Sequence, residues 1–152
     1  MILGPGRWLG RGSYRAIDTT QGTPFSVDMT LTEEEEGRLL EAQLEVEGQS
    51  AIDLTVWIVP DEYGGYTVTV RGPFDVDGTA KLESAPHLGL LWSEDGATHA
   101  AFALFELRDT YGLRGFARHG GNAATWELAL RPQSEAVAGG NVVAFRGGRR
   151  GS

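Results

Sequence analysis

Apolar and polar side chains alternate along much of this chain, which is the pattern of β-strands with one buried and one exposed face. Between Phe25 and Thr32, apolar side chains occupy every second position and polar side chains fill the positions between them. Residues 40–47 repeat this alternation with leucine, alanine and valine against glutamate and glutamine. A helix would scatter those four apolar side chains, since steps of two residues lie about 200° apart on its circumference. A strand is therefore predicted in both places.

Turn-forming residues interrupt the alternation at short intervals. Segments such as 61–65, 93–96 and 119–122 combine glycine, which permits positive φ, with Asp, Asn or Ser, whose side chains bond to the turn backbone. These breaks divide the chain into about ten predicted strands. They are residues 7–17, 23–33, 38–47, 51–60, 66–71, 78–84, 87–92, 97–108, 113–118 and 124–131. The one helix that the pattern allows is a short segment at 133–138.

Short connections favour antiparallel pairing of sequential strands in an up-and-down order. A sheet of ten strands either splits into a sandwich or closes on itself, and closure removes both edges. We therefore predict an all-β fold, an up-and-down antiparallel β-barrel of about ten strands formed by residues 1–131. Residues 132–152 are predicted to form a tail that contains Gly and Arg. A barrel of this width is too large for its own side chains to fill, so an internal cavity is expected.

Composition excludes several classes of partner and of active-site chemistry. The formal net charge of -8 argues against nucleic acid as a partner, because phosphate binding needs a positive surface. The absence of cysteine excludes thiol nucleophiles and cysteine-ligated metals. His87, His99 and His119 are not spaced as metal ligands, so no metal site is expected. No apolar stretch approaches a membrane span and no signal peptide is evident, so we expect a cytoplasmic protein with no membrane partner.

The start of the first predicted strand carries a glycine–tryptophan motif. Gly6, Trp8, Gly10 and Gly12 form the spacing G-x-W-x-G-x-G. This spacing resembles the calycin superfamily, which includes lipocalins, fatty-acid-binding proteins, avidins and nitrobindin-like barrels. The resemblance implies that the Trp8 indole closes one end of the barrel and that a basic residue of the last strand, here Arg131, packs across it. A cation–π contact would favour that arrangement, and Gly10 and Gly12 would let a long first strand bend.

Alternation also selects side chains for the barrel interior. The predicted inward set is Trp8, Tyr14, Phe25, Val27, Met29, Leu44, Tyr66, Val68, Phe105 and Trp126. If Ala101, Ala103 and Phe105 face inward then so does His99, and Tyr14 and His99 are the expected polar contacts for a ligand. The predicted ligand-binding residues are Trp8, Tyr14, Phe25, Met29, Tyr66, His99, Phe105, Arg114, Phe116 and Trp126.

The strand around Phe116 allows two orientations. If Phe116 faces the cavity, then Arg114 and Arg118 do too and would bind a ligand carboxylate. If Leu113, Gly115 and Ala117 point inward instead, both arginines are solvated. The sequence leaves these alternatives open.

Two segments are apolar on both faces. Trp57 and Val59 lie opposite an apolar face of their strand, and residues 88–92 are likewise apolar on both faces. Because one face of each strand must leave the barrel, these side chains suggest a subunit interface and a homodimer.

The function predicted from these features is binding of a small apolar molecule in the barrel cavity, as a lipocalin-like carrier or sensor. One alternative is a cofactor-independent isomerase or cyclase that uses the same cavity, since shape and one or two hydrogen-bonding groups suffice for such chemistry. Another is a haem or nitric-oxide barrel with His99 or His119 as the axial ligand. The predicted final strand, 125–131, contains no histidine, unlike nitrobindin-type barrels. Apart from that haem alternative, no cofactor is expected.

Overall fold

The computed structural model describes residues 3–133, and over this range the protein is an all-β barrel of ten antiparallel strands. The strands are β1 (Gly6–Ala16), β2 (Thr23–Glu33), β3 (Arg38–Val46), β4 (Ile52–Pro60), β5 (Tyr66–Arg71), β6 (Val76–Lys81), β7 (His87–Trp92), β8 (Thr98–Glu106), β9 (Tyr111–His119) and β10 (Asn122–Pro132). The predicted calycin-like fold class is confirmed. No helix long and apolar enough to cross a membrane occurs among the described residues.

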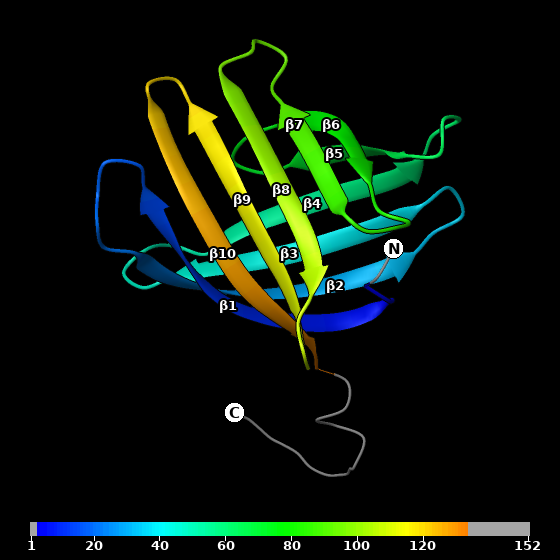
Figure 1. The fold of residues 1–152 in the computed structure, drawn as a ribbon, viewed down its shortest axis with the longest axis horizontal. Helices are drawn as coiled ribbons and strands as arrows, with labels where there is room; N and C mark the ends of the chain where they lie inside the picture. The colour runs from blue at the N-terminus through cyan, green and yellow to red at the C-terminus, as the bar shows by residue number, and fades with distance from the viewer. Residues whose placement is uncertain (1–2, 134–152) are drawn as a thin grey trace.

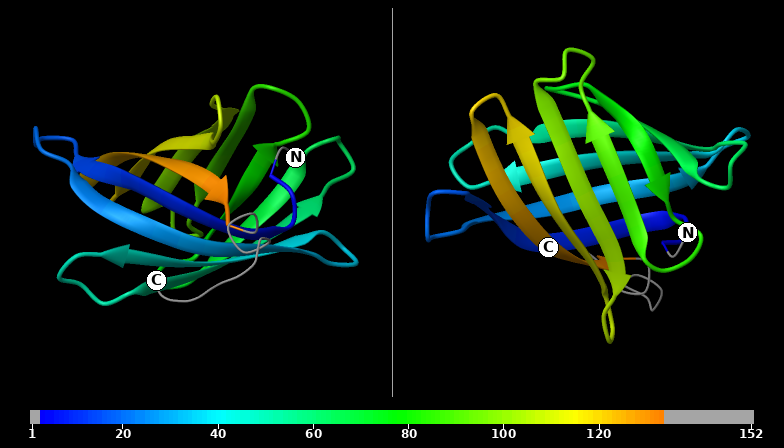
Figure 2. Two further views of the ribbon diagram at one scale, coloured as in Figure 1. Left: turned by 90° about the horizontal axis from the view of Figure 1, so that it is seen from below. Right: turned by 45° about the horizontal axis from the view of Figure 1, so that its top comes forward.

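Each strand pairs with the next in sequence, and β1 closes the barrel by pairing with β10. The closing register runs from Trp8 opposite Pro132 to Ala16 opposite Ala124. Figure 1 shows β8, β9 and β10 running steeply across the front, with β2, β3 and β4 closer to horizontal behind them. Figure 2 shows from two further directions how β1 and β10 join these two groups of strands.

The predicted strand boundaries agree with the structure to within a few residues. Those of β2, β5 and β7 are identical to the prediction, and the largest difference is in β6, which was predicted at 78–84 and spans Val76–Lys81. The segment before Gly78 reads Asp75, Val76, Asp77 and has little strand character by itself. It is extended because Val76 pairs with Val70 of the neighbouring strand. The helix predicted at 133–138 and most of the tail fall outside the described residues.

Glycine in β1 is explained by close approach between strands. A Cβ atom at Gly12 would lie 2.0 Å from the backbone oxygen of Glu127 and 2.6 Å from the Cα of Leu128. Because both atoms belong to backbone that cannot move aside, only glycine fits at this point of the junction between β1 and β10. Gly12 of the motif therefore serves the closure of the barrel.

The buried side chains form two clusters. One joins Leu3, Trp8, Met29, Leu31 and Leu130, together with Val27 and Leu104, where β1, β2, β8 and β10 meet. The other consists of Ile58, Val68, Val70, Val76, Ala80 and Leu82 on the β4–β6 side. In the first cluster Leu31 is 1% exposed and Leu130 is 2% exposed. One end of the barrel is thus filled by its own side chains.

Candidate ligand-binding site

Strand register defines which side chains face the barrel interior. Paired residues of neighbouring strands point to the same side of a sheet. Trp8 pairs with Met29, and both are buried in the first core cluster, so they mark the inner face. Every second residue of each strand, followed around the barrel from this pair, belongs to the inner wall.

We call the end that contains Leu3 and Trp8 the packed end. The Trp8 indole is 6% exposed and meets the Tyr111 ring edge-on, with centroids 5.5 Å apart and planes at 73°. Its Nε1–H donates to the Gly4 carbonyl at 2.9 Å. The chain before β1 therefore turns back over the indole, and Leu3, which is 3% exposed, fills the space beside it.

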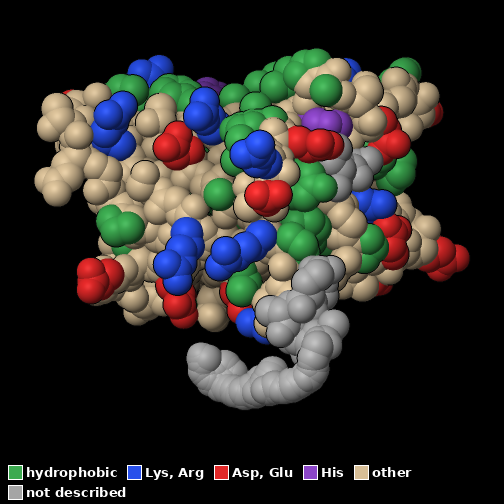
Figure 3. All heavy atoms as spheres, turned by 60° about the horizontal axis from the view of Figure 1, so that its bottom comes forward, with side chains coloured by type: hydrophobic (Ala, Val, Ile, Leu, Met, Phe, Trp, Pro, Cys, Tyr) green, Lys and Arg blue, Asp and Glu red, His purple; other side chains and the backbone are tan. Residues whose placement is uncertain are grey.

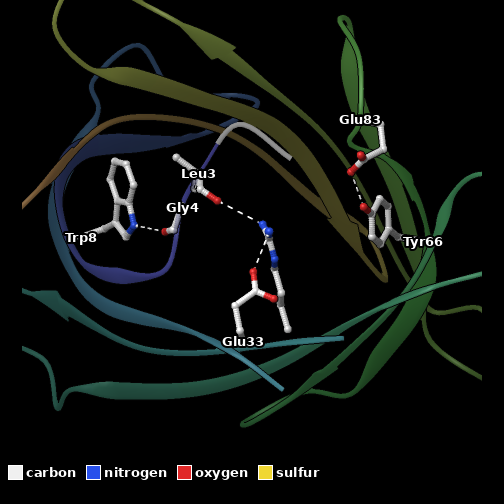
Figure 4. Close-up of polar contacts among 7 residues, drawn as sticks. Leu3, Gly4, Trp8, Glu33, Tyr66 and Glu83 are labelled. Carbon is white, nitrogen blue, oxygen red and sulfur yellow. Dashed lines mark hydrogen bonds and ion pairs between the residues drawn. The ribbon is translucent and has the colours of Figure 1, made fainter. Parts of the chain in front are cut away.

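An arginine holds this returning segment in place. Arg38 faces inward at the start of β3, and its guanidinium donates to the Leu3 carbonyl at 3.2 Å. The same group forms an ion pair with Glu33 at 2.7 Å. Figure 4 shows Leu3 and Glu33 converging on this group inside the barrel, with Trp8 and Gly4 beside them. The packed end is closed by hydrogen bonds from side chains to backbone carbonyls as well as by apolar packing.

A tyrosine–glutamate pair lies farther around the same end (Figure 4). The hydroxyl of Tyr66, on β5, donates to the carboxylate of Glu83, between β6 and β7. This bond raises the pKa of the Tyr66 phenol and lowers the pKa of Glu83, because it stabilises the protonated phenol together with the ionised carboxylate. The two groups are therefore held in complementary protonation states.

The opposite end, where Tyr14, Phe102 and Trp126 lie, is the open end. These three residues share one row of the inner wall, because Tyr14 pairs with Trp126, Trp126 with Gly115, and Gly115 with Phe102. We call this set the aromatic row. All three side chains face the interior of a closed barrel, yet each is only partly buried. Of the three, Phe102 also packs against the second core cluster.

Glycines let the aromatic rings lie across the neighbouring strands. A Cβ atom at Gly115 would lie 2.0 Å from Cζ2 of Trp126. A Cβ atom at Gly89, which pairs with Phe102, would lie 2.2 Å from Cε2 of that ring. Each ring thus occupies the space that a side chain of the adjacent strand would fill. The arrangement covers the wall with flat aromatic surface.

Small side chains lie between the aromatic row and the rim. Ala100 pairs with Ala117, and Ala117 pairs with Ala124, so these three form the next row of the inner wall, which we call the alanine row. At the rim itself, His119 Nδ1 lies 2.6 Å from Oγ1 of Thr98. Hydrogen bonds from the Ser93 hydroxyl and the Ala97 amide, with His119 nearby, hold the pKa of Asp95 below its ordinary value. Polar groups therefore lie at the rim, next to the small apolar side chains of the alanine row.

Most of the residues predicted to face inward do so. The register confirms this orientation for Trp8, Tyr14, Phe25, Val27, Met29, Leu44, Tyr66, Val68 and Trp126. Trp8, Met29 and Tyr66 belong to the packed end, whereas Tyr14, Phe25 and Trp126 lie toward the open one. The Tyr14 and Phe25 rings are in contact, with centroids 6.2 Å apart. Contact of any of these side chains with a ligand stays a prediction.

The inward orientation expected for Phe105 and His99 is wrong. On β8 the buried Leu104 pairs with Leu113 on the inner wall, so the odd-numbered residues of this strand face outward. The same register resolves β9 in favour of its second alternative, with Leu113, Gly115 and Ala117 inward. Arg114, Phe116 and Arg118 therefore lie on the outer surface. Arg114 forms an ion pair with Glu127 at 3.5 Å and lies over the Phe105 ring, 5.4 Å from its centroid.

The expected contact between Arg131 and Trp8 is also wrong. Arg131 pairs with Leu9, and consecutive residues of a strand face opposite sides, so Arg131 lies on the outer face while Trp8 lies inside. Tyr111, Leu3 and the Gly4 carbonyl surround the indole instead.

Sequence reasoning missed two inward polar residues. Arg38 was not selected, and His87 was considered only as a metal ligand, although it is 6% exposed and its Nδ1 lies 3.1 Å from the Leu82 carbonyl. Neither residue belongs to a motif, so register was the signal that could have found them. A depression of about 690 Å³ adjoins His87 at the packed end and is also lined by Pro86, Leu104 and Phe105. Residues 3–133 contain no cluster of three potential metal ligands.

Comparisons with known proteins bear on the fold. No protein-family model matches the chain, and no curated protein matches it either. The structure is similar to that of the S-type phycobiliprotein lyase CPES from Guillardia theta, with a TM-score of 0.65 over 85% of this chain and 88% of the lyase. The two sequences are 11% identical, so the similarity concerns the fold alone. The chain thus has a closed, ten-stranded barrel that fits the calycin-like fold.

Proposed function

We propose that this protein binds a small, flat, apolar molecule inside its barrel, through the open end. The observation that carries the proposal is the aromatic row, in which Tyr14, Phe102 and Trp126 face the interior of a closed barrel and remain partly exposed. Exposed aromatic surface in a concave, apolar setting is characteristic of ligand sites.

The chemistry of the wall supports a flat and uncharged binding partner. Trp126 and Phe102 lie across glycines of the neighbouring strands, and flat rings stack best on flat, conjugated surfaces. The aromatic and alanine rows contain no Asp, Glu, Lys or Arg, so a charged group bound there would lose hydration without gaining a counter-ion. Tyr14 supplies the hydroxyl of the aromatic row, and one hydrogen bond from it would orient a carbonyl or ether oxygen.

A neutral fluorescent probe tests this proposal. N-phenyl-1-naphthylamine is flat and apolar, and its emission rises when it leaves water. We expect saturable enhancement with the wild-type protein. Ala124→Trp, which fills the alanine row, is expected to weaken binding at least about tenfold, or about 1.4 kcal/mol. Ala123→Trp is the matched control, because the same side chain is added to the same strand but faces outward.

The outcome is decisive in either direction. Absence of saturable binding, or equal weakening by the two tryptophan variants, would overturn a site in the barrel. Where the probe binds as expected, native mass spectrometry of the protein from its own source would identify the natural ligand and its stoichiometry. The alternative of an isomerase or cyclase predicts a chemical change in that ligand during incubation, with Tyr14 as the group of the aromatic row able to exchange a proton.

A further inference from the structure

Strand β7 carries its larger apolar side chains on the outside of the barrel. His87, Gly89 and Leu91 face inward, whereas Leu88, Leu90 and Trp92 face outward and are 46%, 56% and 46% exposed. Barrel strands ordinarily show the opposite distribution, with polar residues outside. The outer face of this strand therefore requires a separate explanation.

The neighbouring strands extend this apolar surface. Leu90 pairs with Ala101, which pairs with Phe116, and Phe116 is 42% exposed. Leu88 pairs with Ala103 in the adjacent row. The outer apolar stripe thus consists of Leu88, Leu90, Trp92, Ala101, Ala103 and Phe116. In Figure 3, hydrophobic side chains gather over the upper part of the visible face, among both basic and acidic side chains. A contiguous exposed apolar surface of this kind marks an interaction site.

Charges at the two sides of the stripe are complementary to each other. The outermost row reads Asp77, Trp92, His99 and Arg118 across β6, β7, β8 and β9, so one side is acidic and the other basic. The chain as a whole carries a charge of -8, and two copies therefore repel over most of their surfaces. Around the stripe, Lys81, Arg114 and Arg118 outnumber Asp77 and Glu127 by three to two, which removes that repulsion locally.

We propose that the outer apolar stripe binds the same stripe of a second copy of this chain. A two-fold axis between β7 and β8, roughly along the strands, places β7 over the partner's β8 and reverses the order of the strands. Leu88 and Leu90 then pack on the partner's Ala103 and Ala101, so large side chains meet small ones. The same operation brings Asp77, which is also paired with Arg71 of its own chain at 3.1 Å, toward the partner's Arg118. A two-fold contact requires such self-complementarity, because each residue pair occurs twice with the copies exchanged. The two outer sheet faces would pack with their strands nearly aligned.

The other end of the stripe fits less well. The same axis brings Lys81 toward the partner's Arg114, but Arg114 is already paired with Glu127, and the Lys81 ammonium is bonded to the Ser84 and Pro86 carbonyls. Asp77 is likewise paired with Arg71 within its own chain, so the association depends mainly on the apolar centre, and the contact with Arg118 sets its orientation.

Sedimentation equilibrium of the full chain tests the interface. The wild type is expected to be dimeric. Leu90→Lys is expected to raise the dimer dissociation constant at least about tenfold, because it places a charge at the centre of the stripe. Trp57→Lys is the matched control, since Trp57 is 40% exposed on β4, away from the stripe. A monomeric wild type, or a dimer that Trp57→Lys breaks and Leu90→Lys does not, would overturn the proposal.

A charge exchange tests the two-fold arrangement. Asp77→Arg and Arg118→Asp are each expected to weaken the dimer, because each places like charges opposite one another. The double variant is expected to restore it in part, because the pair between the copies is re-formed with its charges exchanged while Arg71 loses its own partner, Asp77. Failure of restoration would overturn the arrangement. Circular dichroism of each variant separates loss of association from loss of fold, and probe binding in the barrel is expected to be unchanged throughout.

Discussion

Leu130 and Trp126 lie four residues apart on β10, and both face the barrel interior. Leu130 is 2% exposed and packs with Leu3, Trp8 and Leu31, whereas the larger Trp126 is only half-buried. The same alternation therefore produces two different interiors. At the packed end, side chains fill the barrel and stabilise it. At the open end, the aromatic row lines the wall and stays partly exposed, although Val70 and Val76 on the β5–β6 side are buried there as well.

The two ends also differ in what holds them. Backbone carbonyls of the returning N-terminal segment are bonded to Trp8 and Arg38 at the packed end. At the open end, glycines make space for the aromatic rings, and the alanine row places only small side chains between those rings and the rim. Stability and binding thus depend on different residues, and substitutions should separate them.

Truncation of Leu130 should lower the free energy of unfolding more than truncation of Trp126, although Trp126 is the larger residue. Leu130→Ala is expected to lower the free energy of unfolding by about 3 kcal/mol, because it opens a cavity in the packed cluster. Trp126→Ala removes more atoms but is expected to cost only about 1 to 2 kcal/mol, since the ring is half solvated. Urea unfolding measures both values. An equal or greater cost for Trp126→Ala would show that the open end is packed as tightly as the other.

A single added methyl group should disturb the aromatic row. Gly115→Ala places a Cβ atom 2.0 Å from Cζ2 of Trp126, and we expect a loss of about 1 to 3 kcal/mol as the ring is displaced. Binding of the naphthylamine probe should weaken as well. Gly121→Ala is the control, because nothing lies within 4 Å of the added atom there, and its stability should be unchanged or slightly higher. Equal behaviour of the two variants would refute the account of the row.

The smallest expected effect concerns protonation at the packed end. Because the bond to Glu83 raises the pKa of Tyr66, its phenolate absorbance should appear at higher pH than that of free tyrosine. The stabilisation that this bond supplies is lost as pH rises through the raised pKa of Tyr66. It is also lost as pH falls through the lowered pKa of Glu83. Glu83→Gln should return the Tyr66 titration toward the ordinary range, whereas Glu62→Gln, in the neighbouring turn, should leave it in place.

The order and number of strands followed from the sequence because alternation is strong where one face is dry and the other wet. It is clearest in β2, whose bounds were predicted without error. Which side chains of β8 face the interior could not be predicted in the same way. Its residues from Ala100 to Phe105 are all apolar, so alternation does not distinguish the faces, and only pairing with β7 and β9 places Phe102 and Leu104 inside.

The candidate site was predictable to the same extent. Tyr14, Phe25 and Trp126 lie in alternating segments and were identified, whereas Phe105, Arg114 and Phe116 were assigned to the wrong face or left undecided. Phe102 and the alanine row were missed, because the value of a small residue depends on what lies opposite it in the next strand. Arg38 and His87 were not recognised as inward polar residues, because single polar residues carry no spacing signal.

Closure of the barrel limits how this protein can be recognised. Within the described residues every strand has two hydrogen-bonded neighbours, so the sheet has no edge strand to offer another molecule. Addition of a foreign strand, a common route to peptide capture and to amyloid-like assembly, is therefore unavailable while the barrel is intact. Any macromolecular partner has to recognise side chains or loops, and point substitutions can retune that recognition without altering the hydrogen-bonded framework.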